Sequence, residues 1–167
     1  KFRRKKKITQ VNELVAIIKR SKKKNYTNKI NPCTKTFQAL RIFVNKEITE
    51  LVNGIINATK VLKPGGKILV ISFHSIEDKI VKYLFSNFST NKSKPSRYFP
   101  DHDYDSIALF ENYKNKIIKP TEKEINQNYP SRSAKLRFAI RSKNKFQYPN
   151  ELLKKFKKYL DLEALNV

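Results

Sequence analysis

The first third of the chain carries apolar residues at helical spacing. Steps of three and four recur over residues 8–20 and again over residues 36–62, which predicts one short and one long amphipathic helix. The apolar face of the short helix comprises Val11, Leu14, Val15 and Ile18. Thr9 and Thr36 stand where we expect helix N-caps, and Gly54 marks an expected bend in the long helix.

A continuous apolar run follows, KILVISF at residues 67–73, and the turn residues KPGG at 63–66 precede it. A run of this length and composition is typical of a strand that is buried on both faces in a parallel sheet. A new helical pattern covers residues 75–88 directly after the strand. Ser75 and Asp78 have the spacing of a capping box, so we expect Ser75 to cap this helix.

The second half of the chain is less regular. Residues 89–115 predict a long loop, residues 116–120 a strand, and residues 121–128 a short capped helix. Residues 132–141 alternate between apolar and cationic positions, which predicts a half-buried strand whose cations face solvent or phosphate. The alternating positions are Ala134, Leu136, Phe138 and Ile140 on one side, and Lys135, Arg137 and Arg141 on the other. The tail, residues 142–167, is basic and ends in a helical pattern.

The order of these elements predicts an α/β fold. Helices, a strand, a helix, a loop, a strand, a short helix and a strand succeed one another, as in the second half of a doubly wound domain. Such a half, taken alone, leaves one sheet edge and one apolar sheet face uncovered. We therefore expect exposed apolar residues on the sheet.

The chain is strongly basic. It has 37 Lys and Arg against 14 Asp and Glu in 167 residues, which gives a formal net charge of +23. A charge of this size favours a polyanionic partner, above all nucleic acid. The alternative is compositional drift in an AT-rich gene, which would enrich lysine, asparagine and isoleucine without a functional cause.

The start of the chain and its single cysteine predict whether the sequence is a piece of a longer protein and which compartment the protein occupies. The chain contains no methionine and starts at Lys1, so we expect a piece of a longer protein that lacks its N-terminal part. No apolar segment is long enough to span a membrane, and no signal sequence follows the basic start. Cys33 is the only cysteine, which fits a reducing compartment. These features predict a cytoplasmic protein with no membrane partner.

Glycine-rich phosphate loops are missing from the chain. Its three glycines, Gly54, Gly65 and Gly66, match neither the G-x-G-x-x-G fingerprint nor the P-loop. A complete nucleotide or adenosyl site of the glycine-rich kind is therefore not expected within these residues.

The residues that could bind a metal ion are scattered. Cys33, His74 and His102 lie far apart in the sequence and show no ligand spacing. The acidic stretch DHDYD at 101–105 resembles the start of an EF-hand loop, but Ser106 stands where that loop needs glycine. We expect a solvated loop there and no metal site.

The best polar cluster lies at the carboxyl end of the strand at 67–73. Ligands of open α/β sheets bind beyond the carboxyl ends of strands and next to helix N-termini. The candidate pocket-lining residues are Ser72, His74, Ser75 and Asp78. The alternative is structural: Ser75 and Asp78 cap the helix, and His74 anchors the turn. A nucleophilic role for Ser75 lacks support, because no nucleophile elbow surrounds it.

Three stretches stand in a distinctive order: NPCTKTFQALRIFVNKEI (31–48), LKPGGKILVISFHSIEDKIVK (62–82) and KPTEKEINQNYPSRSAKLRFAIR (119–141). Together they resemble the bacterial 16S ribosomal RNA methyltransferases of the RsmH (MraW) family. LKPGG before a strand is common among class I methyltransferases, whereas FHS-x-ED-x-IVK and RSAKLR are particular to this family.

The resemblance implies S-adenosylmethionine-dependent methylation of the N4 amine of a cytidine in the decoding region of 16S rRNA, in the small ribosomal subunit. It also implies a class I, Rossmann-like sheet that a helical insertion domain interrupts. Residues 1–35 would then end that insertion, residues 36–141 would form the C-terminal half of the methyltransferase domain, and residues 142–167 a basic tail with a helix. The candidate RNA-binding residues are Lys35, Arg41, Arg132, Lys135 and Arg137, with a solvated surface as the alternative for the last three.

The chain departs from the family in ways that limit what carries over. The family's glycine-rich cofactor loop and catalytic segment correspond to sequence upstream of Lys1, and Asn31 stands where the family usually has histidine. No catalytic or cofactor-binding residue is therefore assigned, and we expect this piece to be inactive alone. A non-catalytic, basic RNA-binding module is the alternative hypothesis, and the sequence is compatible with a homodimer.

Overall fold

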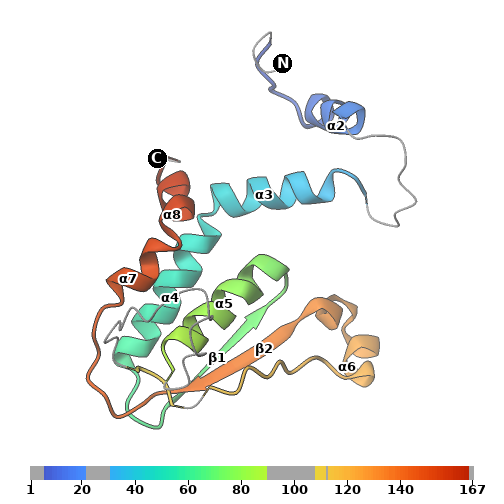
Figure 1. Ribbon diagram of the computed structural model, residues 1–167. Coiled ribbons are helices and arrows are strands. Elements are labelled where there is room, and N and C mark those ends of the chain that lie inside the picture. Colours follow the sequence, from blue (N-terminus) through green and yellow to red (C-terminus); the bar gives the residue numbers. More distant parts are fainter. Residues whose placement is uncertain (1–5, 22–30, 90–107, 112, 166–167) are drawn as a thin grey trace, which may run out of the picture. The chain divides into compact units, whose positions relative to one another are not determined.

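The computed structural model describes residues 6–21, 31–89, 108–111 and 113–165 (Figure 1). They belong to two compact units, one within Lys1–Glu47 and Leu162–Val167, the other within Ile48–Asp161. None of the helices in this described part is long and apolar enough to cross a membrane.

The first unit contains helices α2, Val11–Ser21, and α3, Thr34–Val44. The predicted short helix is thus confirmed, but the Leu14 N–H donates to the Gln10 carbonyl, so Gln10 rather than Thr9 precedes the first turn. Similarly, Cys33 and not Thr36 occupies the N-cap position of α3.

The long helix predicted over residues 36–62 is wrong in one respect. It is divided into α3 and α4, Glu47–Val61, and Gly54 lies within α4 without interrupting it. The break falls at Lys46, which has a φ of 52°. A left-handed residue cannot continue an α-helix, so α3 ends there even though no glycine or proline marks the position.

The second unit is built on a two-stranded antiparallel sheet of β1, Lys67–Ser72, and β2, Lys135–Ile140. In the register, Leu69 lies opposite Phe138 and Ser72 lies opposite Lys135. The expectation of a parallel strand buried on both faces is wrong for the described residues. Here β1 has an antiparallel neighbour along one edge, and its burial alternates along the strand.

One face of this sheet is apolar and uncovered. Leu69 is 60% exposed, Ile71 61%, and Phe73, just beyond the strand, 57%. Phe138, on the same face of β2, is 37% exposed. The expectation that the sheet of a half-domain leaves an apolar face exposed is confirmed.

The opposite face carries the core, and α5, Ser75–Asn87, packs against both strands there (Figure 1). The Phe85 ring meets those of Phe110 and Tyr113 edge-on, at centroid distances of 5.3 and 5.6 Å. Among the described residues of this unit, the largest fully buried side chains are those of Val52, Ile56, Thr59, Val81, Leu84, Phe85, Ser89, Leu109 and Phe110.

The orientation predicted for β2 is inverted. Arg137 is 3% exposed and Arg141 4%, whereas Phe138 between them lies on the open face. Polar partners from distant segments satisfy both guanidinium groups, as described below, so the cations face the interior. Lys135 and Arg137 do share one strand face, as their spacing predicts, but it is the face turned toward α5.

The remaining elements are short. Residues 116–120 form no strand, but Ile118 makes an isolated bridge to Leu136. The predicted capped helix is confirmed as α6, Glu122–Gln127, where the Thr121 hydroxyl accepts from the Glu124 N–H, and η1, Tyr129–Ser133, follows.

The helical tail is confirmed as two helices, α7, Asn150–Lys154, and α8, Lys157–Ala164. Most of the predicted loop, including the DHDYD stretch, Ser106 and His102, lies outside the described residues. The domain boundaries at residues 35 and 141 stay a prediction.

Candidate functional site

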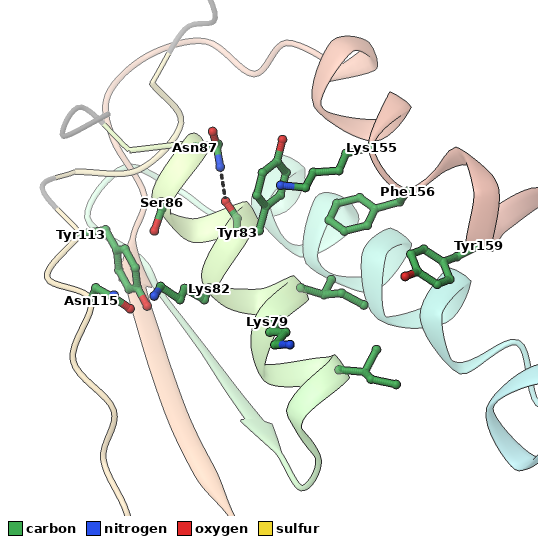
Figure 2. Close-up of a pocket in the computed structure, with 12 residues that line it drawn as sticks. Lys79, Lys82, Tyr83, Ser86, Asn87, Tyr113, Asn115, Lys155, Phe156 and Tyr159 are labelled. Carbon is green, nitrogen blue, oxygen red and sulfur yellow. Dashed lines mark hydrogen bonds between the residues drawn. The ribbon is translucent and has the colours of Figure 1, made fainter. Parts of the chain in front are cut away.

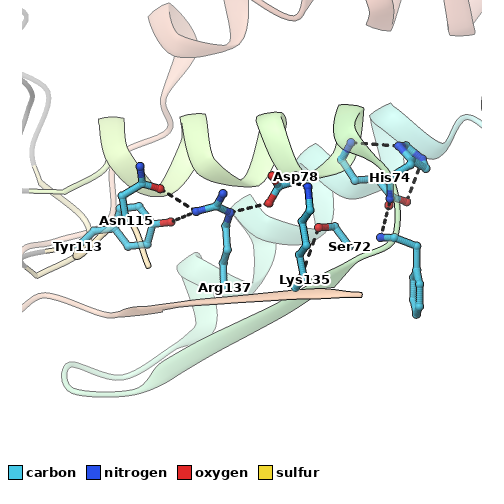
Figure 3. Close-up of polar contacts among 9 residues, drawn as sticks. Ser72, His74, Asp78, Tyr113, Asn115, Lys135 and Arg137 are labelled. Atoms are coloured by element: carbon cyan, nitrogen blue, oxygen red, sulfur yellow. Dashed lines mark hydrogen bonds and ion pairs between the residues drawn. The ribbon is translucent and has the colours of Figure 1, made fainter. Parts of the chain in front are cut away.

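The carboxyl end of β1 leads directly into α5, and His74 is the residue at the junction (Figure 3). His74 has extended backbone angles, φ −131° and ψ 163°, and its Nδ1 accepts from the Glu77 N–H at 3.3 Å. Glu77 Oε2 in turn accepts from the backbone N–H groups of Phe73 and His74, at 2.9 and 3.2 Å. The capping box is therefore His74–Glu77, and the expected Ser75–Asp78 box is wrong, because Ser75 is already the first helical residue.

Both ring nitrogens of His74 are directed at Glu77. Nδ1 accepts a hydrogen bond from the backbone, so it carries no proton in this arrangement. Nε2 lies 3.3 Å from Glu77 Oε1, and the His74 side chain is only 12% exposed. These contacts anchor the start of α5, and Ser72 supports the same corner by donating from its hydroxyl to the Lys135 carbonyl at 3.4 Å.

Asp78 lies one turn into α5 and points toward β2 (Figure 3). Its Oδ1 accepts from Arg137 Nε at 2.7 Å, and its Oδ2 accepts from Lys135 Nζ at 3.4 Å. The hydrogen bond from Arg137 holds the pKa of the Asp78 carboxyl below its usual value, although burial opposes this shift. Asp78 is thus an ionised, buried carboxylate that joins the helix to the strand.

The Arg137 guanidinium has two further partners. Its Nη1 donates to the Tyr113 hydroxyl at 3.0 Å and to Asn115 Oδ1 at 2.7 Å. Burial acts to lower the pKa of Arg137, but the hydrogen bonds to Asp78 and Tyr113 outweigh it and raise the pKa overall. The expectation that Arg137 faces solvent or phosphate is wrong, because these three acceptors hold it inside the unit.

The other predicted RNA-binding cations differ in their exposure and in the contacts that their side chains make within the chain. Lys35 is exposed on α3. Arg41 forms a two-pronged pair with Glu47, at 2.7 and 3.1 Å. Arg132 is exposed, with its guanidinium carbon 4.3 Å from the centroid of the Tyr129 ring. Lys135 is half-buried against Asp78.

Sequence analysis missed a second buried arginine site, at Arg141. Among the described residues, its guanidinium donates to neutral oxygens: the carbonyls of Thr59, Leu109, Ser142 and Asn144 and the Ser142 hydroxyl, at 2.8–3.2 Å. Thr59 lies in the last turn of α4, where carbonyl dipoles favour a cation. The small Ala139 between the two arginines, 3% exposed, was the one local sign that this strand face turns inward.

A groove of about 930 Å³ along α5 was also missed (Figure 2). Its lining residues are Ile76, Lys79, Ile80, Lys82, Tyr83, Ser86, Asn87, Tyr113, Asn115, Lys155, Phe156 and Tyr159. The candidates Ser72, His74, Ser75 and Asp78 do not line this groove, so their place in a substrate pocket stays a prediction.

Comparison with known proteins shows which family the chain is similar to. Residues 1–142 match the sequence model of the MraW methylase family. The chain belongs to this family. It is 42% identical over 145 residues to the ribosomal RNA small subunit methyltransferase H of Ehrlichia canis, which covers 84% of this chain and 44% of that protein. The protein of the same name from Bartonella quintana is 47% identical over 115 residues, 69% of this chain and 34% of its own length.

The chain thus spans less than half the length of these relatives. Helices α7 and α8 lie beyond the residues that the family match covers.

The glycines of this chain do not fit the adenosyl cofactor that methyltransferases generally use. Gly65, with φ +79°, donates its N–H to the Arg141 carbonyl at 2.9 Å. A Cβ on Gly66 would lie 2.9 Å from the Lys63 carbonyl oxygen. Both glycines therefore build the tight turn between α4 and β1, and neither presents free amides to a ligand.

Proposed function

We propose that this chain is the C-terminal portion of an S-adenosylmethionine-dependent methyltransferase that N4-methylates a cytidine in the decoding region of 16S rRNA. The observation that carries the proposal is the family match over residues 1–142, together with relatives named as small-subunit rRNA methyltransferases. We place the enzyme in the cytoplasm, with the small ribosomal subunit as its substrate.

The fold supports a division of the enzyme into two halves. In this proposal the uncovered apolar face at Leu69, Ile71 and Phe73 packs against the preceding part of the same enzyme. The open edge of β1 would pair there with further strands of a Rossmann-like sheet. Residues 1–35 then end a helical insertion and residues 36–141 complete the catalytic domain. The cofactor would be held mainly by the part of the enzyme outside this chain.

The chemistry assigns the chain a supporting role. The cytosine amine is a weak nucleophile because its lone pair is delocalised into the ring, so catalysis depends on positioning and on stabilising developing charge. The base must also leave its stack to reach the pocket. The corner at His74 and Glu77 is a rigid edge for such a pocket, and the exposed cations Lys35 and Arg132 are suited to phosphate.

Methylation assays on the complete enzyme and on this chain test the proposal. Each is incubated with small ribosomal subunits and S-adenosylmethionine, and the digested rRNA is analysed for N4-methylcytidine by mass spectrometry. We expect the modified nucleoside with the complete enzyme and none with the 167-residue chain. Methylation at another atom, or none by the complete enzyme on subunits or naked rRNA, would contradict the proposal.

A non-catalytic RNA-binding module is the second candidate, and the net charge of +23 favours it. It requires the chain to fold alone and to bind RNA with a steep salt dependence. Circular dichroism and light scattering distinguish the two, since half of a domain would aggregate or melt without cooperativity. Light scattering of the complete enzyme also tests for a homodimer.

A further inference from the structure

The groove along α5 is bounded by residues from three parts of the second unit. Figure 2 shows Lys82 near Tyr113 and Asn115 at one end, and Lys155, Phe156 and Tyr159 at the other. The residues at this second end lie beyond the family match, which stops at residue 142. The tail thus adds one wall of a groove to a family-type unit.

The charge of the groove has one sign. Among the residues that the structure describes, its lining includes Lys79, Lys82 and Lys155 and no acidic residue. Lys79 and Lys82 are exposed and form no ion pair among the residues that the structure describes. They are three positions apart on α5, so their side chains leave the same side of the helix. Two unneutralised ammonium groups so placed suit consecutive negative charges.

The rest of the lining is rich in aromatic rings. Tyr83 contacts Phe156 edge-on at 5.3 Å, and Lys155 Nζ lies 3.9 Å from the centroid of the Tyr83 ring. The Tyr113 hydroxyl is held by Arg137. Tyr159 is 49% exposed, so its ring is available to a ligand.

We propose that this groove binds a single-stranded segment of RNA, with Lys79 and Lys82 on successive phosphates and the Tyr159 ring stacked on a base. Cations beside an exposed aromatic ring, here Tyr159, are the usual composition of single-strand sites. An acidic peptide would satisfy the lysines but would leave the aromatic wall without planar partners. The inference rests on the proposed function in so far as RNA is the substrate, and it adds a contact outside the family-matched residues.

The lysines are tested by fluorescence anisotropy with a labelled 12-nucleotide oligouridine at several salt concentrations. We compare K79A/K82A with K60A/K123A, which removes two exposed lysines outside the groove. Loss of two phosphate contacts should reduce the slope of log affinity against log salt by about 1.4, because each contact to a single strand contributes about 0.7. Equal effects of the two double variants would overturn the proposal in favour of diffuse charge.

The stacking contact is tested with Y159L against Y148L, a tyrosine 54% exposed outside the groove. Y159L should weaken binding about tenfold at high salt, where stacking remains and phosphate contacts are screened, and Y148L should leave it unchanged. Equally tight binding of a duplex, or of oligoglutamate with the same charge, would show that no base is recognised. Circular dichroism confirms that each variant is folded.

The same variants are made in the complete enzyme, so that the chain's own stability does not decide the outcome. Oligouridine binding requires no methyl donor, so it is measured independently of methylation. If the complete enzyme methylates rRNA while K79A/K82A and Y159L bind as the unaltered protein does, the groove proposal alone fails. If the variants bind weakly but the unaltered enzyme methylates nothing, the proposed function fails and the groove stands.

Discussion

Arg137 Nε lies 2.7 Å from Asp78 Oδ1, and this ion pair joins the strand β2 to the helix α5 inside the second unit. The two side chains are 3% and 12% exposed, so water solvates neither of them well. A buried charge without its partner is costly, whereas a buried pair with further hydrogen bonds is tolerated. Tyr113, Asn115 and Lys135 supply those further bonds.

Removing one member of this pair should destabilise the fold strongly. We expect D78N and R137M each to lower the free energy of unfolding by about 3–5 kcal/mol, since D78N leaves Arg137 without a carboxylate and R137M leaves Asp78 with only its longer contact to Lys135. Urea unfolding of the complete enzyme, followed by circular dichroism, measures this loss. The double variant D78L/R137M should lose less than either single variant, and K135M, which removes a longer and more exposed contact, less than about 1 kcal/mol. Additive losses in the double variant would argue against coupling of the two residues.

The Asp78 pair also makes a definite prediction about pH. The folded-state pKa of Asp78 lies below its unfolded value, so the pair's contribution to stability is complete above the unfolded pKa, near 4. It is lost as the pH falls through the folded-state pKa. The difference in unfolding free energy between the complete enzyme and its D78N variant should therefore be constant from pH 7 to about 5 and shrink below about 4. A difference that instead grew on acidification would contradict the assignment.

The buried arginines show why part of this fold escaped sequence analysis. The strand β1 and the helices α5 and α6 are marked by local signals, namely apolar runs, helical periodicity and a capping threonine. The facing of β2 depends instead on Asp78, which is 59 positions away from Arg137, and on the Thr59 carbonyl of α4, which accepts from Arg141. Alternation alone shows that a strand has two faces, and distant polar partners decide which one is buried.

The same limit applies to the candidate site. His74 was found because it stands at the end of an apolar run, but its role as a helix cap depends on which nitrogen accepts from Glu77. Likewise, no glycine marks the end of α3, since it is Lys46 that adopts the left-handed conformation there. Lys79 and Tyr159 both line the groove along α5, although their spacing in the sequence does not indicate that they share a site.

The role of His74 can be separated from its capping function. H74A should remove the cap and cost about 1 kcal/mol of stability, whereas H74N should retain most of it, because asparagine is a good N-cap. If His74 only anchors α5, then H74N of the complete enzyme keeps both its melting temperature and its methylation rate. If the imidazole also acts in the pocket, then H74N keeps the melting temperature and lowers the rate. E77Q is the matched control for the other half of the capping box, because its amide oxygen can still accept from the backbone N–H groups of Phe73 and His74.

The uncovered sheet face makes the final prediction. Leu69 and Ile71 are each about 60% exposed, so replacing them with serine removes little buried area from the chain as it stands. We expect L69S/I71S to leave the circular dichroism spectrum of the chain unchanged and to reduce its self-association in light scattering. V61S, which alters an apolar residue 78% exposed on α4, controls for a general gain in polarity.

In the complete enzyme the result should reverse: L69S/I71S should destabilise it by several kcal/mol, because the proposed fold buries that face, and V61S should not. A complete enzyme indifferent to both variants would show that the preceding residues do not pack on this sheet.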